Sequence, residues 1–227
     1  MKILGLINPI IEIDTHRHSK TMNSEQWCEL LEKRIQWIQE NLSPKAKVLI
    51  NFRDFSDAMF TDMTPVLKIA YFLGSMPNDS QPFGIMFEEP TGNYLPEEIG
   101  KWCGGINHIK LYADQIFVIN FWLLFLLSLY LAVRKMMDLA GWNNGHLLAH
   151  VHEKWGFSVG AQLECLANGA NGIWASVCEE GAALGHACST LTLMNLIRYV
   201  TPTYLVLISK KTNYFLDSKY LRSEPSS

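Results

Sequence analysis

The chain has 227 residues, a formal net charge of −3 at pH 7 and no cluster of Lys and Arg, so the composition argues against a nucleic-acid partner. Its five cysteines lie singly and form no Cys-x-x-Cys pair, so the sequence gives no sign of a zinc ribbon or a disulfide scaffold. This favours a reducing compartment, the cytoplasm or an organelle interior. The length allows one domain with a sizeable core, although an eight-stranded α/β barrel typically needs about 250 residues.

The first part of the sequence predicts three βα units. Apolar runs typical of buried parallel strands end in polar residues, and each is followed by residues that favour the start of a helix. The predicted strands are residues 10–14, 48–52 and 83–87, and the helices after them begin near Asn23, Thr64 and Pro96. Two acidic residues, Glu88 and Glu89, follow the third strand directly.

Residues 116–133 interrupt this pattern, because they form a run without a single charge. Such a run reaches the lower length limit of a membrane-spanning helix, with Arg134 and Lys135 as its cytoplasmic flank. However, the interval from Glu88 to His150 is roughly twenty residues longer than one βα unit needs. We therefore expect an apolar insertion, of the kind that translated intron sequence would produce. A membrane anchor is the alternative that we favour less.

The next predicted strand carries the most informative motif. Residues 145–149 form a short apolar run that leads into His150-Val151-His152. In an extended strand the two imidazoles project from the same face, with their Cα atoms about 7 Å apart. Binding residues gather at the carboxyl ends of parallel strands, which is where this pair falls. Two imidazoles placed in this way predict half of a divalent metal site.

A further βα unit follows the histidine pair. Ser158 begins a helix that ends near Asn168-Gly169, residues 173–177 form a strand, and residues 190–199 form the last helix. Between that strand and helix lies a loop with Glu180 and Gly185-His186. Cys178, at the start of this loop, is expected to be a buried packing thiol.

The stretch from Gly145 to Arg198 resembles the carboxyl-terminal part of the pyruvate carboxyltransferase-like domain. This domain is the metal-dependent barrel of 3-hydroxy-3-methylglutaryl-CoA (HMG-CoA) lyase, 2-isopropylmalate synthase and homocitrate synthase. The resemblance implies that His150 and His152 bind a metal. It also implies that His186 stands where the family has an Asn ligand, so that a nitrogen ligand replaces an oxygen ligand. The implied fold is α/β, a partial (β/α)8 TIM barrel with an apolar insertion, over residues 1–200, followed by a divergent tail at residues 201–227.

The resemblance also implies the chemistry. A divalent ion, Mn, Mg, Co or Zn, would act as a Lewis acid on an enolate of a 2-oxo acid or an acyl-CoA, in a carbon–carbon bond lyase or an acyl or carboxyl transferase. Glu153 and Glu180 are candidate acid/base residues, although a glutamate at such a position is more often a surface charge or a helix-end residue. The sequence contains no motif that indicates a nucleotide or biotin site.

Arg53-Asp54 invites comparison with the Arg-Asp pair that ends the family's first strand, where Asp binds the metal. The spacing argues against this, because only about two recognisable βα units separate the pair from His150. We interpret the pair as the end of roughly the fifth strand, so that the chain covers about strands four to eight. Two alternatives stay open: an inactive part of a barrel, or a single-span membrane protein with a binding role. A homodimer could supply the missing strands.

Overall fold

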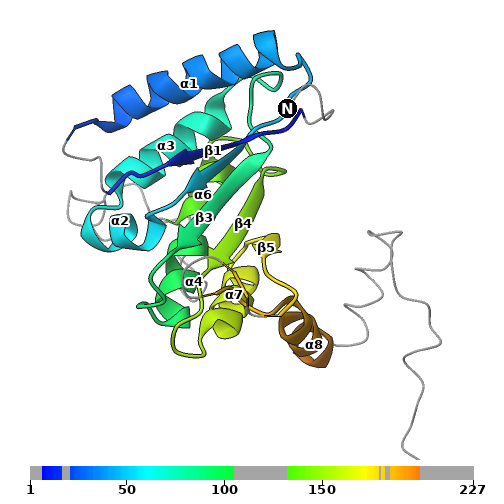
Figure 1. Ribbon diagram of the computed structural model, residues 1–227. Coiled ribbons are helices and arrows are strands. Elements are labelled where there is room, and N and C mark those ends of the chain that lie inside the picture. Colours follow the sequence, from blue (N-terminus) through cyan, green and yellow to red (C-terminus); the bar gives the residue numbers. More distant parts are fainter. Residues whose placement is uncertain (1–6, 17–20, 105–131, 179, 182–184, 200–227) are drawn as a thin grey trace, which may run out of the picture.

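The described part of the chain, in a computed structural model, comprises residues 7–16, 21–104, 132–178, 180–181 and 185–199. Its strands form one parallel sheet whose spatial order follows the sequence, β1-β2-β3-β4-β5 (Figure 1). This arrangement confirms the predicted α/β class, in which each strand lies beside the next one along the chain. The strands are β1 (Ile10–Ile13), β2 (Leu49–Phe52), β3 (Gly84–Glu89), β4 (His146–Val151) and β5 (Gly172–Trp174).

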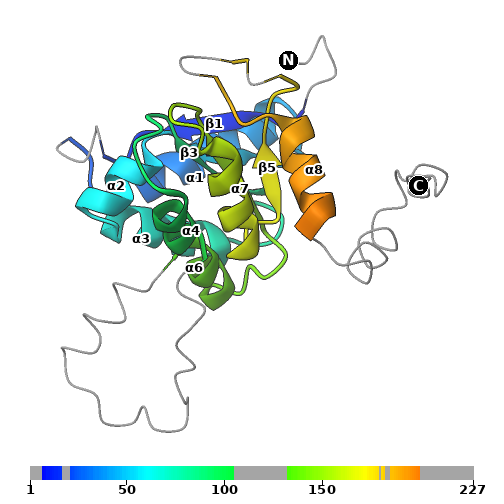
Figure 2. The same ribbon diagram turned by 90° about the horizontal axis from the view of Figure 1, so that it is seen from below.

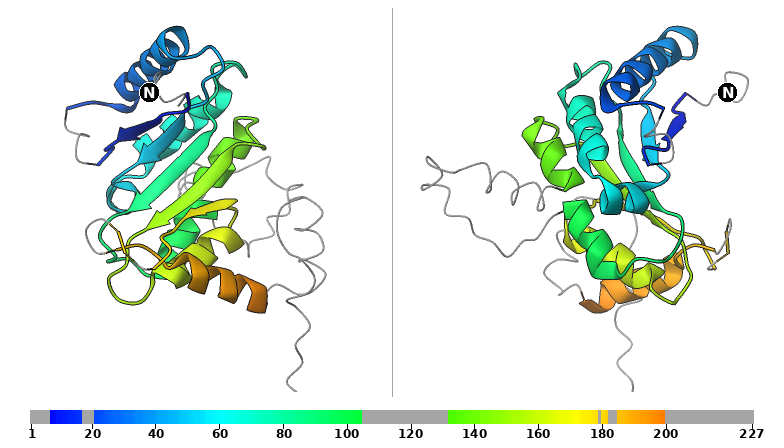
Figure 3. Two further views of the ribbon diagram at one scale, coloured as in Figure 1. Left: turned by 45° about the vertical axis from the view of Figure 1, so that its right-hand side comes forward. Right: turned by 90° about the vertical axis from the view of Figure 1, so that its left-hand side faces the viewer.

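Helices connect the strands and gather on one side of the sheet, while the opposite face is left open among the described residues (Figures 1 and 3). The view from below shows the same layering, with α3, α4 and α6 on the side away from β1 (Figure 2). The helices are α1 (Ser24–Asn41), α2 (Phe55–Thr61), α3 (Thr64–Ser75), α4 (Pro96–Gly104), α6 (Val133–Leu139), α7 (Ser158–Ala167) and α8 (Ser189–Tyr199).

Helix α1 begins where the sequence predicts it. The Asn23 side chain accepts a hydrogen bond from the Gln26 backbone, and the Gln26 side chain accepts one from the Asn23 backbone. This reciprocal cap satisfies two backbone N–H groups that a helix start leaves unpaired. The apolar stripe of the helix is buried, from Trp27 and Leu31 to Ile38. Capping and helical periodicity together therefore fix this element locally.

Successive side chains of each strand point alternately to the face of the sheet that packs on the helices and to the open face. On β2, Ile50 and Phe52 are fully buried on the helix side, whereas Asn51 points to the other side, where it is also buried. The same alternation on β1 leaves Ile10 43% exposed on the open side. Side chains that point away from the helices are therefore free to form a site at the carboxyl ends of the strands.

Two elements differ from the sequence prediction. Strand β5 ends at Trp174 rather than at residue 177, because the chain then turns to meet the segment before α8, where the Ser176 N–H donates to the carbonyl of Ala187 at 3.1 Å. Helix α2 was not predicted. This seven-residue helix places Phe55 in the core. A helix this short is stabilised by such tertiary contacts, which the local sequence does not reveal.

The predicted insertion falls mostly outside the described residues. Residues 116–131 belong to that undescribed part, whereas Ala132 and Val133 are fully buried at the start of α6. Within the described residues, no helix combines the length and the apolar character that crossing a membrane requires. The predicted tail, residues 201–227, also lies outside the described part.

Candidate metal centre

The pairing of β3 with β4 positions the first histidine. The register places Glu88 opposite His150, one residue before the end of each strand. Beyond the strand end, the His152 N–H donates to the Glu89 carbonyl at 3.0 Å, which extends the ladder by one more contact. His150 and His152 therefore stay in extended backbone and project from the open face, as the sequence predicts.

The third histidine arrives from the loop after β5. His186 forms an isolated antiparallel bridge with His152, and the Glu153 N–H donates to the Gly185 carbonyl at 3.0 Å. Gly185 has a φ of 89°, a conformation that residues with a side chain rarely adopt. A side chain on Gly181 would overlap the His186 ring, so this loop needs small residues at both places.

The structure brings the three imidazoles together in one cluster. The ring centroids of His150 and His152 are 4.8 Å apart, those of His150 and His186 are 4.9 Å apart, and those of His152 and His186 are 4.5 Å apart. One candidate ligand atom from each residue lies within 4.8 Å of the others. Nitrogens that share a tetrahedral ion stand about 3.4 Å apart, so the candidate ligand atoms would have to move closer together to bind one.

Several nitrogens of this cluster are buried without a hydrogen-bond partner among the described residues. They are both ring nitrogens of His150 and Nδ1 of His152. A buried polar atom that lacks a partner costs about 1–3 kcal/mol, so native proteins rarely leave three of them together. A neutral imidazole has one lone pair, so a divalent cation would satisfy one nitrogen of His150 together with Nδ1 of His152, and the other His150 nitrogen would carry the N–H. The ligand role of the three histidines stays a prediction.

The Glu88 carboxylate completes the polar side of the cluster. Its oxygens lie 3.2 Å from Nε2 of His152 and 3.8 Å from Nδ1 of His150, and Asn51 donates to it at 3.0 Å. Burial raises the pKa of Glu88, but the hydrogen bonds with His152 and Asn51 and the charge interactions with the histidines outweigh burial, so that the net pKa is lowered. Glu88 is therefore a carboxylate at neutral pH.

The imidazole of His150 is held neutral. Burial lowers its pKa to about 4, since the attraction of Glu88 offsets only part of the desolvation and the other two histidines disfavour a second positive charge. A neutral imidazole is the form that can coordinate a metal.

The two glutamates predicted as acid/base residues have other surroundings. The Glu153 carboxylate accepts hydrogen bonds from the Gly156 N–H at 2.5 Å and from the Ser158 hydroxyl, which ties the loop after β4 to the start of α7. Glu180 is exposed on the loop before His186. These contacts stabilise loops and do not test catalysis, so the acid/base roles of both glutamates stay predictions.

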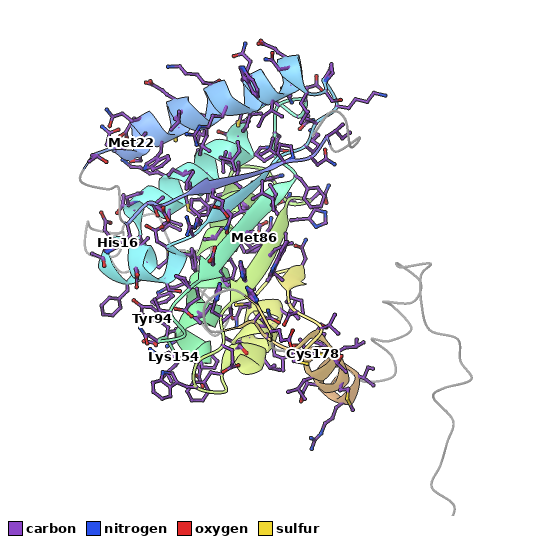
Figure 4. The ribbon with its side chains drawn as sticks, viewed as in Figure 1. His16, Met22, Met86, Tyr94, Lys154 and Cys178 are labelled. Atoms are coloured by element: carbon purple, nitrogen blue, oxygen red, sulfur yellow. The ribbon has the colours of Figure 1, made fainter. Side chains whose placement is uncertain are left out.

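Glu89 and Lys154 organise the loops that follow β3 and β4. The buried Glu89 carboxylate accepts from the N–H groups of Thr91 at 3.0 Å and of Gly92 at 2.6 Å, which folds the loop after β3. Lys154, which is labelled in Figure 4, follows β4. Its ammonium donates to Asn93 at 2.6 Å and so joins the loop after β3 to the one after β4.

Two other predicted features have a different outcome. The prediction that Cys178 is a buried thiol is wrong, because β5 ends early and leaves this side chain exposed. At the end of β2, Arg53 lies 3.7 Å from Glu12 of β1, and Asp54 accepts from the Thr15 N–H at 2.8 Å. Asp54 thus anchors the loop after β1.

Comparison with known proteins supports the fold. No family model and no curated protein matches the chain. Among solved structures, it is similar to the N-terminal domain of a "putative aldolase" from Bacteroides vulgatus, with 14% identity, a TM-score of 0.50, and coverage of 93% of this chain and 57% of that one. It is also similar to the HMG-CoA lyase from Brucella melitensis, with 12% identity, a TM-score of 0.49, and coverage of 84% and 58%.

These similarities concern the fold alone. The chain spans 57% of the length of the aldolase chain, and its open five-stranded parallel sheet fits the predicted partial barrel. The α/β fold predicted from the sequence is therefore shared with the first of these structures, at 14% identity.

In the metal-free protein, we expect His150 to titrate near pH 4. An unfolded chain takes up this proton near pH 6.5, whereas the folded chain resists it until about pH 4. The folded state is therefore favoured above pH 6.5, and this contribution is lost as the pH falls from 6.5 to about 4. Histidine ¹H–¹⁵N NMR would measure the midpoint, with a His150→Asn variant to assign the signal. A midpoint at or above 6.5 would contradict the burial argument.

Proposed function

We propose that His150, His152 and His186 hold a divalent metal ion, and that the chain acts in carbon–carbon bond cleavage or in acyl or carboxyl transfer through an enolate. The observation that carries this proposal is the buried cluster of three imidazoles with unpartnered nitrogens. When bound, such an ion supplies a Lewis acid that stabilises the negative charge of an enolate oxygen.

The donor set guides the choice of metal. Three imidazole nitrogens suit zinc, cobalt or manganese better than magnesium, because magnesium prefers oxygen ligands and retains its water. The nearby Glu88 carboxylate offsets part of the positive charge that the neutral imidazoles leave uncompensated. We therefore propose zinc or cobalt as the ions that bind most tightly.

The open face of the sheet gives a substrate access to this cluster. Trp174, which is 43% exposed, lies with its ring centroid 5.8 Å from that of His150 and offers an apolar wall. Arg53 directly follows β2 at the same end of the sheet, and its half-exposed guanidinium lies 3.7 Å from the Glu12 carboxylate. An aromatic ring beside the cluster and a cation at the carboxyl end of β2 suit a 2-oxo acid or an acyl-CoA, the substrate class that we propose.

Metal analysis tests the site directly. The purified protein should retain about one equivalent of a divalent ion, because a site with three protein ligands holds a single ion. The double substitution His150→Ala, His152→Ala should abolish retention, since one imidazole cannot hold the ion alone. Mass spectrometry of the eluted metal gives the stoichiometry.

His146→Ala is the matched control for this experiment, because His146 lies on the same strand but at its amino end, stacked on Phe83. It should bind metal as the unchanged protein does. A folded wild-type chain that binds no zinc, cobalt or manganese would refute the proposed metal site.

Enolate chemistry is tested by isotope exchange. Metal-loaded protein in deuterium oxide should exchange the methyl protons of pyruvate or acetyl-CoA about a hundredfold faster than the double histidine variant does. The variant lacks the ion that would stabilise the negative charge of the enolate. Proton NMR follows the loss of the methyl signal. If metal binds and no 2-oxo acid or acyl-CoA exchanges, the chain is the inactive part of a barrel.

We also propose that residues 116–131 are an insertion into the barrel unit. The last two residues of the predicted run, Ala132 and Val133, are fully buried at the start of α6 and are therefore left out of the proposed insertion. Deleting residues 116–131 should leave the circular dichroism spectrum and the metal stoichiometry unchanged. A deletion that also removes Ala132 and Val133 is the control and should lower the free energy of unfolding, because it empties part of the core. Loss of folding in the shorter deletion would contradict the insertion.

A further inference from the structure

Glu88 links the histidine cluster to the middle of the sheet. It lies one residue before the end of β3, opposite His150 of β4, and its side chain is only 12% exposed. One carboxylate oxygen accepts from the Asn51 amide at 3.0 Å, and the other lies 3.2 Å from Nε2 of His152. Both oxygens therefore have a hydrogen-bond partner, and Asn51 fixes the plane of the carboxylate.

The direction of the bond to His152 follows from the chemistry of its two partners. An ionised carboxylate can only accept, so the proton of this bond belongs to Nε2 of His152. A neutral imidazole carries one proton, which leaves the lone pair on Nδ1. That atom is buried and has no hydrogen-bond partner among the described residues.

We propose that Glu88 is a positioning residue that selects the tautomer of His152, with Nε2–H facing Glu88 and Nδ1 facing the ion. This inference rests on the metal site proposed above. Histidines that bind metals usually donate their other ring N–H to a carboxylate or a carbonyl, which fixes the ring and strengthens the ligand. Here Asn51 holds Glu88, and Glu88 in turn holds His152.

The same geometry argues against a direct bond from Glu88 to the ion. Each carboxylate oxygen already faces an N–H donor, and coordination would require one of these hydrogen bonds to break. His150 does not compete for the carboxylate, since its Nδ1 lies at 3.8 Å, beyond hydrogen-bonding distance. His152 is therefore the imidazole that Glu88 orients.

Cadmium NMR tests which nitrogen coordinates. The full chain, labelled with ¹⁵N-histidine and loaded with ¹¹³Cd, should show one-bond coupling from the metal to Nδ1 of His152. Coupling to Nε2 instead would overturn the inference, because Glu88 could not then accept from that atom. Failure of the unchanged protein to bind cadmium, zinc or cobalt would refute the metal site itself, which separates the two proposals.

Substitution of Glu88 supplies the second readout. Glu88→Ala should raise the Kd for zinc by about 10–100-fold and mix the two His152 couplings, because the tautomer is no longer fixed. Glu88→Gln keeps an accepting oxygen and should recover most of the affinity with the Nδ1 coupling. Glu97→Ala, an exposed acidic position in the first turn of α4, is the control and should change neither value. Unchanged coupling and affinity in a folded Glu88→Ala protein would refute the positioning role.

Discussion

The parallel pairing of β3 with β4 is the constraint on which the candidate site depends. Because the two strands run in the same direction and in a fixed register, Glu88 and His150 emerge side by side at the same end of the sheet. A shift of one residue would turn one of these side chains toward the helices. The buried apolar residues on the helix side, such as Phe87 and Ala149, prevent that shift, so the core holds the site in register.

The site carries a cost that the rest of the fold must offset. Three imidazoles and a carboxylate are withdrawn from water in a small volume, and part of their hydrogen-bonding capacity has no protein partner among the described residues. The low pKa of His150 expresses this burial. Such an arrangement is unfavourable unless a ligand compensates for it, which is the physical reason for proposing a metal ion at this cluster.

Local sequence signals predicted much of the fold. The features that depend on contacts between distant segments were not predicted. The apolar runs gave the strands, and the Asn23 cap gave the start of α1, because these features depend on residues near one another in the chain. The short helix α2 and the early end of β5 escaped prediction. Both depend on contacts with distant segments, and the exposure of Cys178 follows from the second of them.

The sequence by itself determined the alternation of strands and helices and the extended His150-Val151-His152 pair, because periodicity and residue type act over a few residues. Only the tertiary structure decided that His186 folds back onto this pair, and that Glu88, 64 residues before His152, bonds to its ring. These contacts depend on sheet register and on the turn at Gly185. Both are set by the packing of the whole sheet rather than by any local stretch.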